Sequence, residues 1–314
     1  QRAVGPEAVR LACGQLALCG GEEALPSLAV MLGRVDGAPF VPMALCGIPG
    51  DGPLHVLSGA LPVVTPAQRG QLLNSMGRRS STAAAGAVAP WCAHADETVA
   101  VGALRALGRL GGSDYAYVLV DAQRDERVAV RTEAAAALLN IAQRELAAGH
   151  RIRAQQLLGR LPATSPLHIR RGAFELLLQS DSDGGAERAL RLLSARSPDP
   201  ILAPVAVSAL PRFAGRTTAE RFAGLWTNLP PELHAALADA LARRVLERDD
   251  RRAHRALVRA MWWEPAPLRE AAILALGRCG GPKEVGPLWE RWVSGGGVEQ
   301  NAAVRALVAL PDHA

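Results

Sequence analysis

The chain has 314 residues and a formal net charge of +5, with 49% hydrophobic, 21% charged and 4% aromatic residues. This balance is typical of soluble, well-packed proteins and excludes a disordered chain, and no apolar run approaches the roughly 18 residues of a membrane span. The net charge is divided almost evenly, with +2 over residues 1–165 and +3 over residues 166–314. A concentrated basic footprint for nucleic acid is therefore not apparent at this scale.

Apolar residues recur at three- and four-residue spacing along most of the chain, which predicts amphipathic helices. The first pair is expected at 7–18 and 22–32. Residues 34–66 are punctuated by Gly and Pro, so we expect an irregular unit with short helices near 40–46 and 53–61, and a degenerate repeat explains it better than a functional insertion. Further helices are expected at 66–76, 82–93, 96–110, 114–123, 125–145, 152–161, 167–179, 185–195, 200–213, 217–229, 231–247, 251–263, 267–278, 283–293 and 299–309.

The same helical pattern recurs within the sequence. An acid-led apolar helix occurs twice in succession over 96–141, and the run Leu107 to Gly112 returns as Leu276 to Gly281. Recurrence of one helix-pair unit predicts an all-α superhelix of about nine pairs, forming a single solenoid over 1–314. The unpaired helix near 298–310 is expected to cap it, with Ala302, Leu307 and Leu310 packed and Gln300, Asn301 and Arg305 exposed.

The repeat resembles a known family of helical arrays. Asp ahead of Val-Arg, followed by an Ala-rich stretch and Leu-Gly-x-Leu-Gly at the helix end, is similar to HEAT repeats of the bacterial phycobilisome-lyase type, best at 96–141 and 267–293. The resemblance implies the fold and is almost silent on function. Similar arrays serve as scaffolds, partner-binding adaptors, bilin lyases, iron-dependent hydroxylases and alkylpurine glycosylases, so function has to be argued from a site.

The sequence contains no recognisable catalytic, metal-binding or phosphate-binding motif. None of the seven His residues is followed by Glu, as the iron site of the hydroxylases would require, and no other group has metal-ligand spacing. No nucleophile motif or phosphate loop occurs, so we expect no catalytic residues, no metal and no cofactor. The five cysteines form no CxxC pair and are interpreted as reduced core residues, which places the chain in the cytoplasm.

Five of the six tryptophans lie in the C-terminal third of the chain. The helical period places Trp226 with Phe222 and places Trp289 and Trp292 with Leu288, so these three are expected in the core. Only Trp262 and Trp263 remain for an exposed role. That number is too small to favour a glycosylase-type enzyme, which would hold a damaged nucleotide among aromatic residues.

We expect a non-enzymatic scaffold or adaptor that binds another protein on the concave face of the solenoid. On the helix at 251–263, Leu257 defines the buried side, and Arg251, Arg255, Arg259 and Trp262 gather opposite to it. Arg259 and Trp262 can stack. The same construction leaves Arg151, Arg188 and Arg191 outward on earlier second helices. Such a basic stripe suits an acidic or phosphorylated protein segment. The alternatives are a solvated arginine face and, for function, a HEAT-like protein or enzyme acting on nucleic acid.

Overall fold

The computed structural model describes residues 5–34, 39–79, 84–196 and 198–311, and these residues form helices and no strand. They fall into two compact units, Gln1–Ala173 and Phe174–Ala314. The helices of unit 1 are α1 Pro6–Cys19, α2 Leu25–Leu32, α3 Val41–Gly47, α4 Gly52–Ala60, α5 Pro66–Arg78, α6 Ala85–Val88, α7 Glu97–Leu110, α8 Ala116–Ala122, α9 Val128–Ala147 and α10 Arg151–Leu158. Helix α11, Leu167–Ser180, contains the boundary, and unit 2 continues with α12 Ser182–Leu193, α13 Leu202–Ser208, α14 Thr218–Gly224, α15 His234–Arg248, α16 Arg251–Ala260, α17 Ala266–Cys279, α18 Val285–Ser294 and α19 Gly297–Ala309. Short 3₁₀ turns precede or extend several helices, at Glu22–Ala24, Ala89–Ala93 (η3), Ser113–Tyr115, Leu210–Arg212 (η5), Trp226–Asn228, Pro231–Leu233 and Pro282–Glu284.

The helix starts follow from capping residues in the sequence. Thr65 forms a capping box with Gln68 at the start of α5. Asp96 accepts a hydrogen bond from the backbone N–H of Val99 at 3.2 Å at the start of α7, and Asp250 does the same for two N–H groups of α16. Each cap satisfies backbone donors that the first helical turn leaves free, so these polar residues fix where the helices begin.

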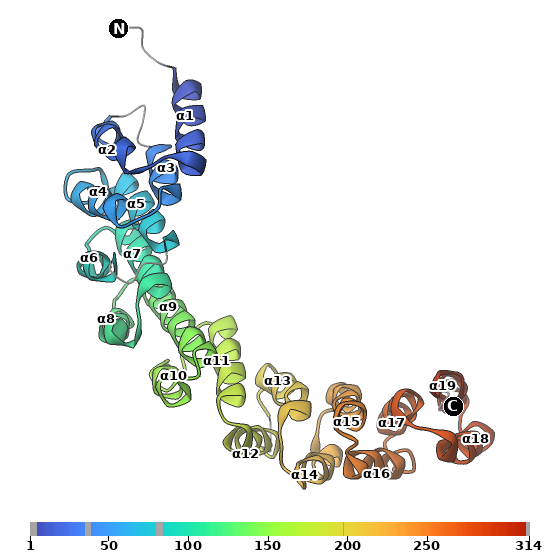
Figure 1. Cartoon of the computed structure of the whole chain (residues 1–314). Coiled ribbons are helices and arrows are strands. Elements are labelled where there is room, and N and C mark those ends of the chain that lie inside the picture. Colours follow the sequence, from blue (N-terminus) through green and yellow to red (C-terminus); the bar gives the residue numbers. More distant parts are fainter. Residues whose placement is uncertain (1–4, 35–38, 80–83, 197, 312–314) are drawn as a thin grey trace. The chain divides into compact units, whose positions relative to one another are not determined.

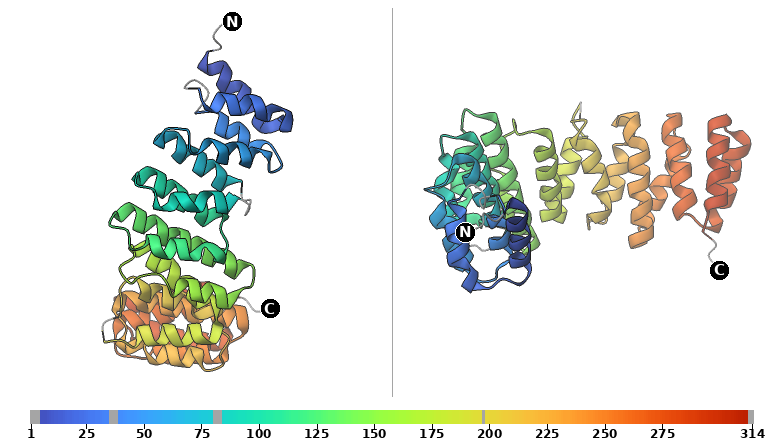
Figure 2. Two further views of the ribbon diagram at one scale, coloured as in Figure 1. Left: turned by 90° about the vertical axis from the view of Figure 1, so that its left-hand side faces the viewer. Right: turned by 90° about the horizontal axis from the view of Figure 1, so that it is seen from above.

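In each unit the helices pack in two layers (Figure 1). The odd-numbered layer contains α1, α3, α5, α7 and α9 in unit 1 and α13, α15, α17 and α19 in unit 2, and the even-numbered helices form the other layer. Figure 2 shows the helices of unit 1 stacked pair above pair in its left view and those of unit 2 side by side in its right view. Apolar residues of the helices are buried between the layers, where leucine and alanine form most of the core.

Glycines allow unusually close contact within the odd-numbered layer. A Cβ atom added at Gly108 of α7 would lie 2.7 Å from the Cα of Ala137 on α9. The same pairing occurs between Gly77 on α5 and Ala106 on α7, where the distance would be 2.9 Å. Because these contacts involve backbone atoms, a side chain at either glycine would force the helices apart.

Arginines at the end of one helix of the odd-numbered layer bind carbonyl groups at or just past the end of the preceding helix of the same layer. The Arg79 guanidinium donates to the carbonyl of Ile48 at 2.7 Å, past the end of α3. Arg144 of α9 donates to Gly108 O at 2.9 Å and Gly111 O at 2.6 Å at the end of α7. The buried Arg244 of α15 donates to Leu210 O at 3.1 Å beside η5. The carbonyls at a helix end lack the partner that a following turn would supply, and the arginines bind them; Leu210 O also accepts from the backbone N–H of Phe213.

The helical pattern predicted from the sequence is confirmed, including the short helices at Val41–Gly47 and Gly52–Ala60 in the irregular region, of which 35–38 lie outside the described residues. The first residues of the helix expected at 82–93 also lie outside them, and the rest forms the short α6 and the 3₁₀ turn η3. Ala302 is buried on α19, and Leu307 and Leu310 are half-buried against the core. The outer side of α19 is less polar than expected, since Val298, Val304 and Val308 are exposed. A single solenoid over 1–314 stays a prediction.

Candidate partner-binding surface

The structure places the predicted arginine patch on the exposed side of α16. Arg251, Arg255 and Arg259 are all exposed there, and Trp262 follows the helix with 43% of its surface exposed. The ring face of Trp262 is occupied by a different arginine than expected, because the guanidinium carbon of Arg291 on α18 lies 5.1 Å from the ring centre.

The remaining predicted arginines lie on α10 and α12. Arg191 on α12 is exposed, whereas Arg188 is half-buried and its Nη1 has no hydrogen-bond partner among the described residues. Arg151 is exposed at the start of α10, in unit 1. A basic stripe formed by the arginines of α10, α12 and α16 therefore stays a prediction.

Two of the tryptophans expected in the core are exposed. Trp226 is fully buried, as expected, but Trp289 is 55% and Trp292 37% exposed, with their ring centres 4.6 Å apart. On α18 only Leu288 is buried, because no further even-numbered helix packs against the opposite side of α18 among the described residues. The core prediction for Trp289 and Trp292 is wrong.

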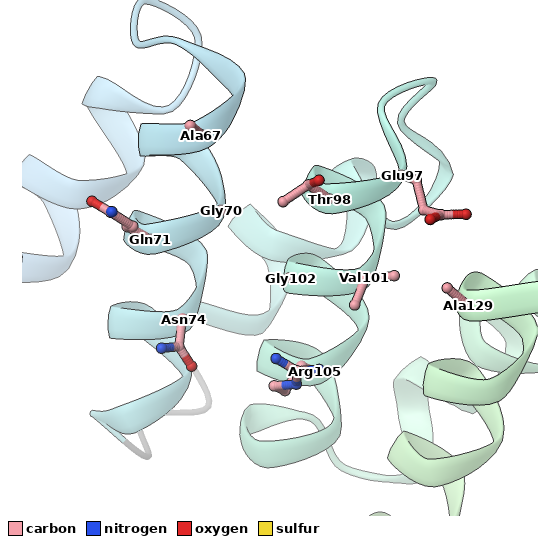
Figure 3. A pocket seen from close by; sticks show the side chains of 10 residues that line it. All are labelled: Ala67, Gly70, Gln71, Asn74, Glu97, Thr98, Val101, Gly102, Arg105 and Ala129. Atoms are coloured by element: carbon pink, nitrogen blue, oxygen red, sulfur yellow. The ribbon is translucent and has the colours of Figure 1, made fainter.

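The exposed side of the odd-numbered layer in unit 1 carries a first hollow of about 410 Å³ (Figure 3). Gly70 on α5 faces Gly102 on α7, and the lack of side chains at both positions opens the surface between the helices. Figure 3 shows Thr98 directed from α7 toward α5, with Asn74 and Arg105 near the opposite end of the hollow. The charge of Arg105 is neutralised, because its guanidinium donates to both carboxylate oxygens of Glu133 at 2.7 and 3.0 Å.

A second hollow of about 550 Å³ lies further toward the C-terminal ends of the same three helices. We call it the basic hollow, and its lining is Gly77, Arg78, Gly108, Arg109, Asn140, Gln143 and Arg144. Arg78 and Arg109 are exposed on α5 and α7, and Arg109 donates to the side-chain oxygen of Asn74 at 3.0 Å. Burial lowers the pKa of Arg144, which is held by the carbonyls at the end of α7 and by that of Arg109.

The odd-numbered layer of unit 2 carries a corresponding hollow of about 390 Å³ over α15, α17 and α19. Arg278 there occupies the position of Arg109 in the repeated Leu-Gly-Arg sequence. Its Nη1 lies 2.7 Å from a carboxylate oxygen of Asp239, which also pairs with Arg243 at 3.2 Å. The charge of Arg278 is thus neutralised by a carboxylate in unit 2, whereas Arg109 in unit 1 donates to the neutral side-chain amide of Asn74.

A hollow of about 700 Å³ on the even-numbered layer of unit 1 lies between η3 and α8. Its charged side chains include opposite pairs, since Arg124 lies 3.7 Å from Asp121. Asp125, at its edge, accepts side-chain and backbone hydrogen bonds from Arg127, which lower its pKa to about 2. Charge in this hollow is therefore largely compensated.

The hollows described above lie on the surfaces of the two helix layers. Among the described residues, no group of three or more His, Cys, Asp or Glu side chains comes together as a metal would require. No helix among them combines the length and the apolar run that crossing a bilayer requires. The sequence contained one signal for the basic hollow, because Arg78, Arg109 and Arg144 follow one another at 31 and 35 residues, close to the repeat length.

No protein-family model and no curated protein matches the chain in sequence. Among solved structures, the karyopherin Kap121p bound to the extreme C-terminus of the protein phosphatase Cdc14p is similar, with a TM-score of 0.59 and 11% identity over 92% of this chain and 37% of that one. A homology model of the AP-3 complex gives a TM-score of 0.53 with 12% identity over 91% of this chain and 58% of that one. Human deoxyhypusine hydroxylase in complex with glycerol gives 0.37 with 18% identity over 92% and 96%, a likeness too weak to argue from. The chain therefore has the fold of a HEAT-like helical solenoid and spans less than two thirds of the karyopherin and AP-3 chains that it matches.

Proposed function

We propose that the chain is a scaffold or adaptor that binds a segment of another protein on the exposed side of α5, α7 and α9. The observation that carries this proposal is the pair of hollows on these three helices, each lined by glycines and edged with hydrogen-bonding side chains. Solenoids present long faces of this kind rather than closed cavities, so extended recognition is what their geometry offers. The similar karyopherin is bound to a protein C-terminus in its own structure, which agrees with such a role.

We also propose a repeat type, a cellular location and a second contact surface for this chain. The Asp, Val-Arg and Leu-Gly-x-Leu-Gly pattern supports repeats of the bacterial phycobilisome-lyase type. The absence of disulfides among the five cysteines supports a cytoplasmic location. The exposed arginines of α16, in unit 2, are a second proposed contact surface.

The test is to capture partners from the source cell, identify them by mass spectrometry, and map the binding of a purified partner by hydrogen exchange. We expect protection of peptides from α5, α7 and α9. Ala67 is exposed at the edge of the first hollow, so Ala67→Trp should block partner binding, whereas Ala12→Trp, at an exposed position of α1, should not. Equal binding by both variants would remove this face as the site.

Nucleic acid is the alternative partner, and a salt series tests it. Binding of DNA or RNA that weakens steeply with the logarithm of salt concentration would favour that alternative. Absence of nucleic-acid binding at low salt would remove it.

A further inference from the structure

We propose that the basic hollow binds an anionic side chain, a carboxylate or phosphate, of the protein segment that lies along α5, α7 and α9. This inference rests on the proposed function and names the chemistry of the partner. Three guanidinium groups from three successive helices line one hollow: Arg78 from α5, Arg109 from α7 and Arg144 from α9. Arginine presents several donors in a planar fork that matches carboxylate and phosphate oxygens.

The positive charge of the hollow is only partly offset from within the described part of the chain. No carboxylate there forms an ion pair with Arg78, Arg109 or Arg144. Glu145 follows Arg144 directly and acts on it through its charge, but its carboxylate forms no ion pair with Arg144 and lies 2.8 Å from Nδ1 of His150. Three like charges around one hollow repel one another, so an incoming anion relieves the repulsion.

Two of the three guanidinium groups are held in place before any ligand arrives. The carbonyls of Gly108 and Gly111 fix Arg144, and the Asn74 amide oxygen accepts from Arg109. Holding a side chain in its binding position lowers the entropy that binding would otherwise cost. Arg78 is exposed and forms no hydrogen bond with described residues, so it is free to close on the ligand.

The corresponding position in unit 2 supports a specific role for unit 1. There, Asp239 replaces the neutral partner and binds the equivalent arginine, Arg278, at 2.7 Å. If this arginine served only to hold the helices together, an aspartate on the neighbouring helix could bind it, as Asp239 binds Arg278 in unit 2. The amide of Asn74 keeps Arg109 in position and leaves its charge available.

A protein segment fits the basic hollow better than nucleic acid. Single-stranded nucleic acids are held by aromatic side chains on which bases stack, in addition to basic grooves. None of the residues that line the basic hollow or the first hollow is aromatic. Asn74, Asn140 and Gln143 instead offer amide groups that can pair with a peptide backbone.

The test uses Asn74→Asp, a nearly isosteric change that reproduces the arrangement of unit 2. Fluorescence anisotropy with the full chain would compare a labelled peptide containing several glutamates with the same peptide containing glutamines, and a third peptide with phosphoserines. We expect the parent chain to prefer the anionic peptides, and Asn74→Asp to weaken their binding by about tenfold. The matched control Asn301→Asp adds the same charge at an exposed position of α19 and should leave binding unchanged.

Preference for the glutamate or for the phosphoserine peptide identifies which anion the hollow takes, and either supports the proposal. Equal binding of glutamate and glutamine peptides by the parent chain, or full binding by Asn74→Asp, would overturn it. Tighter binding of a labelled oligothymidine than of both anionic peptides would also overturn it. Failure of the proposed function is seen separately, because it is measured with the captured partner and Ala67→Trp.

Discussion

Replacing Gly108 by alanine tests whether close helix contact holds the odd-numbered layer together. In an isolated helix this change would be favourable by about 1 kcal/mol, because alanine has the higher helix propensity. In the structure the new Cβ would lie 2.7 Å from both the Cα and the Cβ of Ala137, inside ordinary van der Waals distance. The neighbouring atom is backbone, so no side-chain rotation can relieve the contact.

The magnitude follows from how far the helices must separate. Carbon atoms pack best at about 3.5–4.0 Å, so α7 and α9 must move apart by about 1 Å, which weakens the surrounding contacts by a quarter to a half. Overpacking of this kind costs about 1–3 kcal/mol. After the gain in helix propensity of about 1 kcal/mol, we expect Gly108→Ala to lose up to about 2 kcal/mol of folding free energy.

Gly59→Ala provides the matched control in the same unit. Gly59 lies in α4 and is exposed, and nothing lies within 4 Å of an added Cβ atom. This variant should be unchanged or more stable by up to about 1 kcal/mol. Urea denaturation followed by far-UV circular dichroism would compare the midpoints of the two variants with the parent. A midpoint for Gly108→Ala at or above that of Gly59→Ala would refute the close-contact argument.

The remaining predictions concern titratable groups. Burial disfavours the charged form of Glu299, but hydrogen bonds from Arg269 and Arg291 outweigh it and lower its pKa. Its contribution to stability is therefore present above the ordinary carboxyl pKa and is lost as the pH falls through the lowered folded value. Glu299→Gln should lower stability at neutral pH by about 3 kcal/mol and flatten this acid dependence, as measured by denaturation midpoints across pH. For the cysteines, alkylation of the native chain followed by mass spectrometry should label the exposed Cys19 and spare Cys92, whose thiol pKa is raised by burial to about 12; equal labelling of both would contradict the structure.

The sequence predicted the helices because their signals are local. A capping acid such as Asp96, the three- and four-residue apolar spacing and the Gly and Pro punctuation all act within a few residues. The exposure of Trp289 was not predictable in this way, because it depends on whether another helix covers the far side of α18. Cys19 was likewise expected in the core and is exposed at the end of α1.

The basic hollow was missed for a related reason. From the sequence, Arg109 belongs to a repeated Leu-Gly-Arg motif that indicates a helix end and a turn, and nothing local separates it from Arg278. The difference lies in residues that precede them by 35 and 39 positions, Asn74 and Asp239. Only the packing of one helix on the next brings an amide to the first arginine and a carboxylate to the second.

Arginine has two separate uses in this chain, which explains why the net charge alone says little about its partner. Arg79, Arg144 and Arg244 each donate to several carbonyl groups at the end of a preceding helix. A lysine has a single ammonium group and cannot span such a set of acceptors, so this use favours arginine on structural grounds. Arg78 and Arg109 bind no backbone carbonyl group among the described residues, and both are exposed. Their charges, together with that of Arg144 at the same hollow in unit 1, connect the composition of the chain to an anionic partner.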